Sequence, residues 1–532
     1  MPGFPHVDSA TSERSQARGR SGFLRAGRVL GLAPGVAGEA IWWEDGRVRA
    51  IGPAAAVSRL VPSGTPGLDL PGALVTPGFV DAHTHFATWA LGRRRVQLVG
   101  ARTRAEALRL VAAAKPVGGW VLGQGWDANA WEVPPDRLAL DALHPGPVYL
   151  DSLDLHAAWL NTPALAAAGI GQETPDPFGG RIVRDAAGEP TGVLLDRAVE
   201  LALPALPAPP DDALLAALTE GQAEAHRLGI TGIHDVESEQ VLGAFRQLEA
   251  ADALRLRVLF HPPVAALHRL VAAGVRSGQG SEWLGMGGVK LFLDGSLGKQ
   301  TAWMLEPYQN SRDRGMPITG LEDAREAVRL AAEAGIAATV HAIGDAAVRR
   351  ALDLLTEALP VAIPHRIEHF QCVHPADLER AARLGVVVSM QPAHLLTDVP
   401  LVERFWGARG RGAYSFRSIL ATGATLAFGS DVPVASIDPR EGVYAATVRI
   451  SRDGCAAWRP EERVDFETAV RAYTEAPARA AGVAQRRGTL APGQDADLVA
   501  WDVDPTVAVD PGVFRHARAR LTVVGGEVVM RA

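Results

Sequence analysis

Cysteine is scarce in this sequence, which contains only Cys372 and Cys455 among 532 residues. Two cysteines so far apart do not make the disulfide framework of a small secreted domain, and they suit a reducing cytosol. No apolar run reaches the roughly 18 residues that a membrane-spanning helix needs. We therefore expect a cytoplasmic protein with no membrane anchor, in which both cysteines are packing residues.

Long basic runs are also missing, and the formal net charge is -7. A protein that binds nucleic acid or anionic lipid mainly by charge needs the opposite balance, so we expect neither partner. Residues 1–22 are polar and rich in proline, glycine and serine, and they lack the apolar core of a secretory signal. We expect this segment to be a disordered tail.

The sequence does have the material for a large core, with 47% hydrophobic and 21% charged residues. Its length indicates one large domain with additions, or two or three domains. IWWEDGRVRAIG has a hairpin signature, with Asp45-Gly46 between two alternating runs. The C-terminal segment has the same strand-like pattern. We expect residues 23–73 and 487–532 to form one small composite β-sandwich domain.

Between these two segments, strand-like and helix-like stretches alternate over residues 74–486. Apolar strands that alternate with amphipathic helices, such as 323–335 and 345–359, predict parallel strands with right-handed crossovers. Eight such units make a (β/α)₈ TIM-like barrel of the α/β class. The eight predicted strands are 74–85, 231–236, 255–261, 286–294, 336–342, 365–371, 386–391 and 425–431.

Two further strand-like stretches, 120–126 and 147–152, would raise the number of strands to ten. We assign them to an insertion of about residues 90–215 after the first barrel strand. An insertion at this point leaves the barrel at its C-terminal face, where barrels of this type keep their active sites. We expect part of the insertion to cover the site, with Trp126 and Trp131 as candidate pocket walls. The alternative is a peripheral excursion that stabilises the shell.

Histidines stand at the predicted ends of several strands. His83 and His85 are two residues apart in TPGFVDAHTHF, so on a strand they face the same side. Neutral imidazole is the commonest metal ligand in proteins. His341, His369 and Asp431 end three later strands, and in a parallel barrel these ends converge on one face.

Nitrogen and oxygen ligands without thiolate suit Zn, Mn, Fe or Ni. The sequence therefore predicts a metal site at this face. The alternative is a set of polar residues that are each satisfied separately.

Lys290 stands in the middle of the apolar stretch GGVKLFLDG. Burying an unpaired ammonium costs several kcal/mol, and Asp294 is about 13 Å further along the same strand. A desolvated lysine can have its pKa depressed to about 5–6. The free amine can then react with CO₂ to give an anionic carbamate, whose two oxygens can bridge two cations.

In this order, the motifs resemble the amidohydrolase superfamily, in the branch that includes the N-substituted formamide deformylases. The resemblance extends over nearly the whole chain after the tail, and it implies a barrel flanked by a composite β-sandwich. DLHAAWLNTPAL (154–165) and GEPTGVLLD (188–196) in the insertion also resemble this branch. The other matching stretches are HTH, VKLFLDGSLG, VHAIGD, RIEHFQ, FGSDVP and GTLAPGQDADLVAWD.

The resemblance implies a role for each matching residue of this sequence. His83 and His85 would hold the more buried metal with Asp431, and carboxylated Lys290 would bridge it to a second metal. The resemblance implies that both metals are zinc, with Mn, Fe or Ni as alternatives, and that His341 and His369 would hold the second. A metal-bound hydroxide would then attack the substrate, with Asp431 as general base and then general acid.

Other residues are candidates for contact with the substrate. His394 follows the seventh predicted strand, His234 ends the second, and Asp294 could orient either the lysine adduct or the loop. His156 with Asn161 either stabilises the insertion or contacts substrate. Glu368, next to a proposed ligand, is expected to face the opposite side of its strand and to have no catalytic role.

The leading function is hydrolysis of a carbon–nitrogen bond, an amide or a formamide, in a small-molecule substrate. A lactone, a carbamate or a cyclic amide is an alternative substrate. A Schiff-base lyase that uses Lys290 would leave the histidines without a role, and a non-catalytic binding protein would have no use for the complete ligand set. A homodimer is compatible with the sequence.

Overall fold

The computed structural model describes residues 19–532 except 130, 453, 455, 509 and 511. Most of the predicted tail and Cys455 therefore lie outside the described residues. Cys372 is a buried free thiol, as its expected packing role requires. Among the described helices, none has both the length and the apolar character that a membrane crossing requires.

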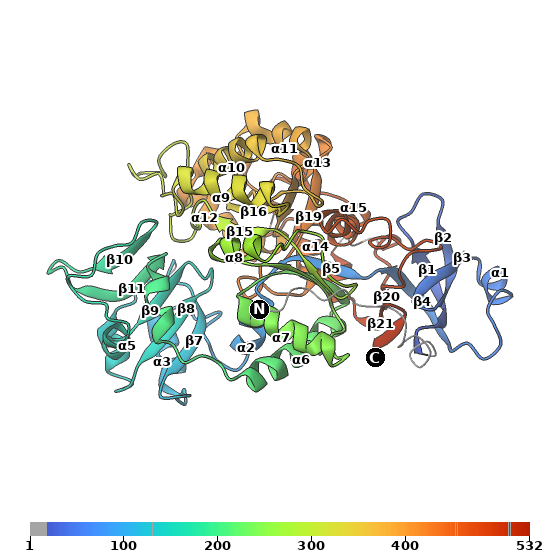
Figure 1. Cartoon of the computed structure of the whole chain (residues 1–532), viewed down its shortest axis with the longest axis horizontal. Helices are drawn as coiled ribbons and strands as arrows, with labels where there is room; N and C mark the ends of the chain where they lie inside the picture. The colour runs from blue at the N-terminus through green and yellow to red at the C-terminus, as the bar shows by residue number, and fades with distance from the viewer. Residues whose placement is uncertain (1–18, 130, 453, 455, 509, 511) are drawn as a thin grey trace.

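Both ends of the chain contribute strands to one seven-stranded sheet, of order β22-β21-β20-β4-β1-β2-β3. Figure 1 shows the blue N-terminal strands beside the red C-terminal ones. Asp45 (φ 53°) and Gly46 (φ 76°) form the turn between β2 and β3, which confirms the predicted hairpin. The strands are β1 (Gly22–Leu30), β2 (Ala37–Glu44), β3 (Arg47–Gly52), β4 (Gly67–Pro77), β20 (Leu498–Trp501), β21 (Ala519–Val524) and β22 (Glu527–Arg531).

A second sheet, of order β10-β11-β9-β8-β7-β6, is built from residues 96–196 and lies at the opposite end of the molecule from the first (Figure 1). Trp126, Trp131 and Trp159 form its aromatic core, with ring centroids 6.0–6.3 Å apart. Its strands are β6 (Val96–Gln97), β7 (Val121–Trp126), β8 (Val148–Ser152), β9 (Ala157–Leu160), β10 (Gly180–Arg184) and β11 (Pro190–Asp196).

Parallel strands form the centre of the molecule, in two sheets of order β14-β13-β12-β5 and β15-β16-β17-β18-β19. Isolated parallel bridges connect the two sheets along both lateral edges. Thr84 pairs with Val432 at one edge, and Pro263 pairs with Lys290 at the other. This arrangement confirms the α/β class. The strands are β5 (Phe79–Thr84), β12 (Ile230–Val236), β13 (Arg257–His261), β14 (Leu284–Met286), β15 (Val289–Phe292), β16 (Ala338–Ala342), β17 (Arg366–His369), β18 (Val387–Met390) and β19 (Thr425–Phe428).

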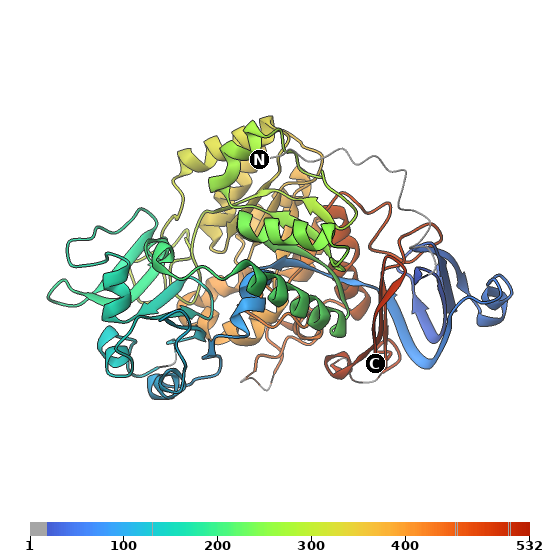
Figure 2. The same cartoon turned by 60° about the horizontal axis from the view of Figure 1, so that its bottom comes forward.

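Helices surround these parallel strands (Figure 2). Two of them confirm predicted helices, since α9 and α10 correspond to 323–335 and 345–359 to within two residues at each end. The helices are α1 (Ala54–Ser58), α2 (Phe86–Gly92), α3 (Arg104–Ala112), α4 (Arg137–Asp141), α5 (Thr162–Ala167), α6 (Asp211–Arg227), α7 (Glu239–Ala250), α8 (Leu267–Ala272), α9 (Leu321–Glu333), α10 (Asp345–Glu357), α11 (Leu378–Leu384), α12 (Leu395–Phe405), α13 (Phe416–Ala421), α14 (Pro439–Thr447), α15 (Phe466–Tyr473) and α16 (Glu475–Ala480).

The strand predicted over residues 74–85 is two strands. Its first part belongs to β4 of the terminal sheet, and β5 begins only after Gly78. A side chain at Gly78 would collide with Thr231 of β12, so glycine allows the two strands to approach closely where the chain changes sheet. At the other end of the parallel array, the predicted strand 425–431 is shorter than expected: β19 stops at Phe428, and Asp431 lies three residues beyond it.

Trp501 fills the seam between the terminal sheet and the parallel strands. It is fully buried, and its indole N–H donates to Thr76 Oγ1 at 3.0 Å. Its ring lies 5.4 Å from that of Phe79 and 4.9 Å from that of Phe514. Gly229 has φ of 80°, and a Cβ there would be 2.5 Å from the Trp501 ring. The seam is therefore shaped around this one side chain.

We expect Trp501→Ala to lower the free energy of unfolding by about 3–5 kcal/mol, because it leaves a large cavity in a packed seam. Urea unfolding followed by circular dichroism measures the loss. Val528→Ala is the control, since Val528 is in the same sheet but 48% exposed. Equal unfolding midpoints for the two variants would contradict the role given to Trp501.

Candidate metal centre

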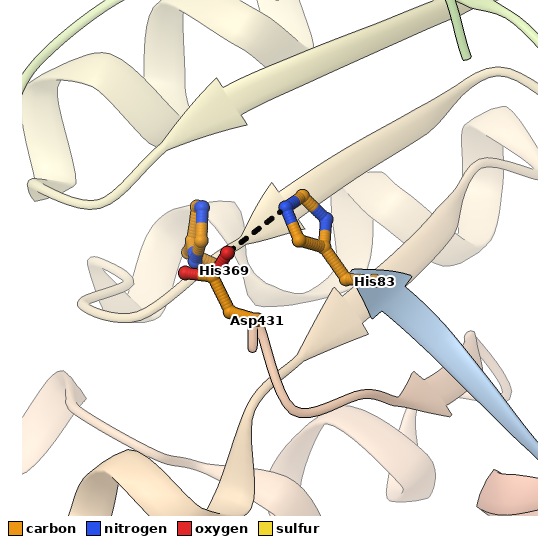
Figure 3. Close-up of side chains that lie close together, drawn as sticks. All are labelled: His83, His369 and Asp431. Atoms are coloured by element: carbon orange, nitrogen blue, oxygen red, sulfur yellow. Dashed lines mark ion pairs between the residues drawn. The ribbon is translucent and has the colours of Figure 1, made fainter. Parts of the chain in front are cut away.

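His83 and His85 approach one carboxylate oxygen from the end of β5. The Nε2 atoms of both histidines lie 3.4 Å from Oδ1 of Asp431. Their Nδ1 atoms are engaged elsewhere, that of His83 with the Glu368 carboxylate and that of His85 with the Val236 carbonyl at 2.8 Å. Each Nδ1–H donates to its acceptor, so each Nε2 has a lone pair that points toward the same place. Figure 3 shows His83 and Asp431 facing each other across this gap.

His369 joins these groups from the end of β17. Ligand atoms of His83, His369 and Asp431 all lie within 4.8 Å of one another, and all three residues are buried (Figure 3). His369 Nδ1 is 2.9 Å from Gln391 Oε1, which leaves Nε2 for the centre. His369 (φ 70°) and Asp431 (φ 59°) both have left-handed backbones, which cost about 1–3 kcal/mol each and cluster at functional sites.

His341 lies next to His369, with 4.3 Å between the ring centroids. Its Nε2–H donates to the Gly295 carbonyl at 3.3 Å, so Nδ1 is the nitrogen with a lone pair. Burial holds the pKa of both His341 and His369 well below the ordinary histidine value. Both rings are therefore neutral, which is the form that binds metals.

Lys290 is 2% exposed, and its Nζ has no hydrogen-bond partner among the described residues. The amine lies 4.7 Å from the centroid of the Phe292 ring and lines a cavity together with the histidines. Burial lowers the pKa of Lys290 to about 8, although Glu368 and Asp431 act in the opposite direction. The amine is thus buried beside the centre without a direct partner.

Glu368 contacts the centre, which the sequence did not predict. The expectation that it faces away from the ligands is wrong, because its carboxylate contacts His83 Nδ1 and also accepts from Arg366. Alternation along β17 places Arg366 and Glu368 on the inner side, and the left-handed turn at His369 brings that residue inward as well. Burial alone would raise the pKa of Glu368, but Arg366 and His83 hold it well below the ordinary range.

Two cavities meet at this centre. One has a volume of about 120 Å³ and the other about 270 Å³. Residues of the predicted insertion contribute to both. The first cavity is lined by Asp127, Asn129, Leu153, Asp154 and His156, and the second by Asp154, Leu155, His156, Asp196, Arg197, Val199, Glu200 and Leu203. The residues that line both cavities are Asp154, His156, His341, His369, Asp431 and Val434.

Comparison with known proteins identifies the family of this chain. A family model described as "Amidohydrolase family" matches residues 67–530. The chain belongs to the amidohydrolase family. The resemblance inferred from the motifs is thus confirmed.

Individual relatives of this amidohydrolase cover most of its length. The putative amidohydrolase YtcJ of Bacillus subtilis is 33% identical over 92% of this chain and 96% of its own. N-substituted formamide deformylase of Arthrobacter pascens is 26% identical over 92% and 94%. The crystal structure of an uncharacterized metal-dependent hydrolase from Pyrococcus horikoshii has a TM-score of 0.76 at 28% identity, and the match covers 92% of this chain and 98% of that one. These relatives support a metal-dependent hydrolase.

The donor set of this amidohydrolase fits a divalent metal. Imidazole nitrogens and carboxylate oxygens without thiolate suit Zn, Mn, Fe or Ni. Nε2 of His83 is buried and has no hydrogen-bond partner among the described residues. A buried acceptor without a donor is costly, and a cation at this place would satisfy it.

Of the other predicted site residues, some line a cavity at the centre and others do not. His394 lines the smaller cavity, with Nε2 3.2 Å from the Ser430 carbonyl and 3.9 Å from Asp431 Oδ2. His234 does not line either cavity at the centre; Arg366 donates to its Nδ1 at 2.8 Å, and it borders a separate cavity with Arg257 and Asp497.

Three more candidates occupy structural positions. Asp294 accepts hydrogen bonds from the backbone N–H groups of Trp303, Ile343 and Gly344 at 2.8–3.0 Å, so it fixes the loop beyond β16. Burial raises the pKa of Asp294 to about 7. Trp126 and Trp131 belong to the core of the six-stranded sheet, and neither is among the described residues that line the two cavities.

We expect Glu368→Gln to weaken zinc binding by about 10- to 100-fold, because the carboxylate that orients His83 is lost. Competition with a chelating dye measures the zinc dissociation constant. Glu462→Gln is the control, since Glu462 is also buried but accepts from Ser418, away from the centre. A zinc affinity equal to that of the wild type would show that Glu368 does not support His83.

Proposed function

We propose that the chain hydrolyses a carbon–nitrogen bond, in an amide or a formamide, with divalent metal bound at this centre. The observation that carries the proposal is the approach of His83 Nε2 and His85 Nε2 to one oxygen of Asp431, at 3.4 Å each. The name of the Arthrobacter relative, an N-substituted formamide deformylase, supports the choice of bond. Lactones, carbamates and cyclic amides are the alternative substrates.

His83, His85 and Asp431 would hold one ion, and His341 and His369 would hold a second. When bound, such metals supply an activated water and polarise the substrate carbonyl. The short distance between the His341 and His369 rings supports their joint role, while the proximity of His369 to His83 also suits a single ion. We infer two ions, zinc first among Zn, Mn, Fe and Ni.

Lys290 would link the two ions as a carbamate. Its amine is buried without a partner among the described residues and lines the cavity that His83 and His341 also line. The ammonium would first lose one proton, and the neutral amine nitrogen would then add to the carbon of CO₂ with loss of a second proton. A costly buried cation would thus become an anionic oxygen ligand.

Asp431 would move the proton of the reaction. Its Oδ1 faces the histidines of β5, and its Oδ2 lies 3.9 Å from His394 Nε2 on the cavity side. It is therefore placed to accept a proton from the attacking water and to deliver it to the leaving amine. Its left-handed backbone holds the carboxylate in this position beyond the end of β19.

The fold is consistent with this proposal. We infer that the parallel strands, with β14 and β15 counted together as one interrupted strand, close as a (β/α)₈ barrel over residues 79–486, with residues 90–215 inserted after its first strand. The bridges from Thr84 to Val432 and from Pro263 to Lys290 support closure. The chain ends would form the accessory β-domain from residues 22–77 and 487–532, since β4 continues to Pro77.

Metal removal is the first test. Protein purified without chelator should contain about two metal atoms per chain by inductively coupled plasma mass spectrometry, as a paired site requires. It should turn over at least one member of a panel of N-benzylformamide, N-benzylacetamide, a five-membered lactam and a lactone. Dipicolinate treatment should abolish this turnover, and zinc should restore it. Activity that survives complete metal removal would refute the proposal.

Lys290→Ala should lower metal content from about two atoms per chain to one or fewer, because the bridging group is lost. Added short carboxylic acids should restore part of the content. Lys299→Ala is the control, since Lys299 lies in the smaller cavity and its amine is 3.4 Å from Asp154. Unchanged metal content in Lys290→Ala would exclude the bridging role.

Asp431→Asn should lower kcat by about 100-fold or more, because an amide cannot take the proton from water. The change keeps the shape of the side chain, so the thermal unfolding midpoint should move little. Steady-state kinetics on the best panel substrate measures the effect. A kcat near that of the wild type would rule out the proton-transfer role.

A further inference from the structure

His156 stands at the centre without belonging to the proposed ligand set. It comes from the turn between β8 and β9, and thus from the six-stranded sheet and not from the parallel strands. Its ring centroid is 5.3 Å from that of His341 and 6.4 Å from that of Phe292. It is one of the six residues that line both cavities.

Asp196 holds this imidazole in place. Its Oδ1 lies 2.7 Å from His156 Nδ1, and its backbone N–H donates to the His156 carbonyl at 2.8 Å. Asp196 ends β11 with φ of 49°, a left-handed backbone that is uncommon for a residue other than glycine. Strain of this kind persists only where the surroundings enforce it, and it clusters at functional sites.

The loop after β15 makes room for the pair. A Cβ on Gly295 would be 2.5 Å from Asp196 Oδ1, so glycine is needed for the carboxylate to reach its position. The carbonyl of the same glycine accepts from His341 Nε2. One short segment therefore contacts both a proposed metal ligand and the carboxylate that fixes His156.

The other five residues that line both cavities are proposed metal ligands, are apolar, or are already bonded to other side chains. His341, His369 and Asp431 are proposed ligands, and Val434 is apolar. Asp154 accepts from Ser152 at 2.6 Å and from Ser296 at 2.8 Å, and lies 3.4 Å from the Lys299 amine. His156 has Nδ1 engaged with Asp196, so Nε2 is the nitrogen that it presents at the junction of the cavities.

We propose that His156 is a further catalytic residue, which hydrogen-bonds through Nε2 to the amide group whose bond is broken. The inference rests on the proposed function. A substrate with one substituent in each cavity places its scissile amide at their junction, where the ligands and His156 meet. Asp196 is then a positioning residue, because it sets the tautomer and the orientation of the imidazole.

The test compares His156→Ala, His156→Gln and Asp196→Asn on the best panel substrate, with zinc content and thermal unfolding measured for each. His156→Ala should lower kcat about 100-fold or more, since a hydrogen bond at the reacting group is lost, while zinc content stays unchanged. His156→Gln, which keeps a donor and an acceptor, should recover part of the rate. Asp196→Asn should cost about tenfold.

Added imidazole should restore part of the rate of His156→Ala, a result that a merely structural role would not give. His144→Asn is the matched control, because His144 belongs to the same segment and bonds the Val111 carbonyl at 2.8 Å without lining either cavity. Its rate should equal that of the wild type.

Binding of benzohydroxamic acid, measured by calorimetry on zinc-loaded protein, gives a second readout without turnover. Its dissociation constant should rise at least tenfold in His156→Ala. A wild type that binds and turns over, beside a His156→Ala protein with unchanged kcat and affinity, overturns the role of His156 alone. A zinc-loaded wild type that neither binds nor turns over overturns the proposed function, and the role of His156 with it.

Discussion

The centre depends on the contacts that the buried Glu368 carboxylate makes with Arg366 on one side and His83 on the other. A buried charge is tolerated only when it is paired and hydrogen-bonded. Here the Arg366 guanidinium provides both the opposite charge and the hydrogen bonds. Arg366 also donates to the Ala82 carbonyl and to His234, so one side chain connects β17 with β5 and β12. The position of His83 is therefore fixed by Glu368 and Arg366, which lie in the interior between the parallel strands.

Above this layer, ligand atoms of His83, His369 and Asp431 lie within 4.8 Å of one another, and His85 Nε2 is 3.4 Å from Asp431 Oδ1. Backbone and amide groups hold the far nitrogens of His85, His369 and His341, and this leaves one lone pair of each ring for the centre. Preorganisation of this kind needs rigid supports, and strand ends supply them. The same strand ends are where the chain adopts left-handed backbones at His369 and Asp431.

That these side chains come together could be predicted from the sequence, because their convergence follows simple rules of alternation and strand-end position. His83 and His85 have the two-residue spacing of one strand face, and His341, His369 and Asp431 follow apolar stretches. The inward position of Glu368 could not be predicted, because strict alternation would place it on the opposite side from His369. The positive φ of His369 breaks that alternation and turns both side chains inward. Trp126 and Trp131 could not be placed, since aromatic residues suit a sheet core and a pocket wall equally well.

The seven-stranded sheet ties the first described strands to the last ones. β4 pairs with β1 on one side and with β20 on the other, and β20 is made only after the entire parallel array has been synthesised. During translation, β4 therefore carries an open hydrogen-bonding edge while the rest of the chain emerges. Open edges pair with other chains, so the ribosome-bound protein is exposed to misassembly for most of its synthesis. The exposed edge of β4 is covered only when the C-terminal strand β20 pairs with it.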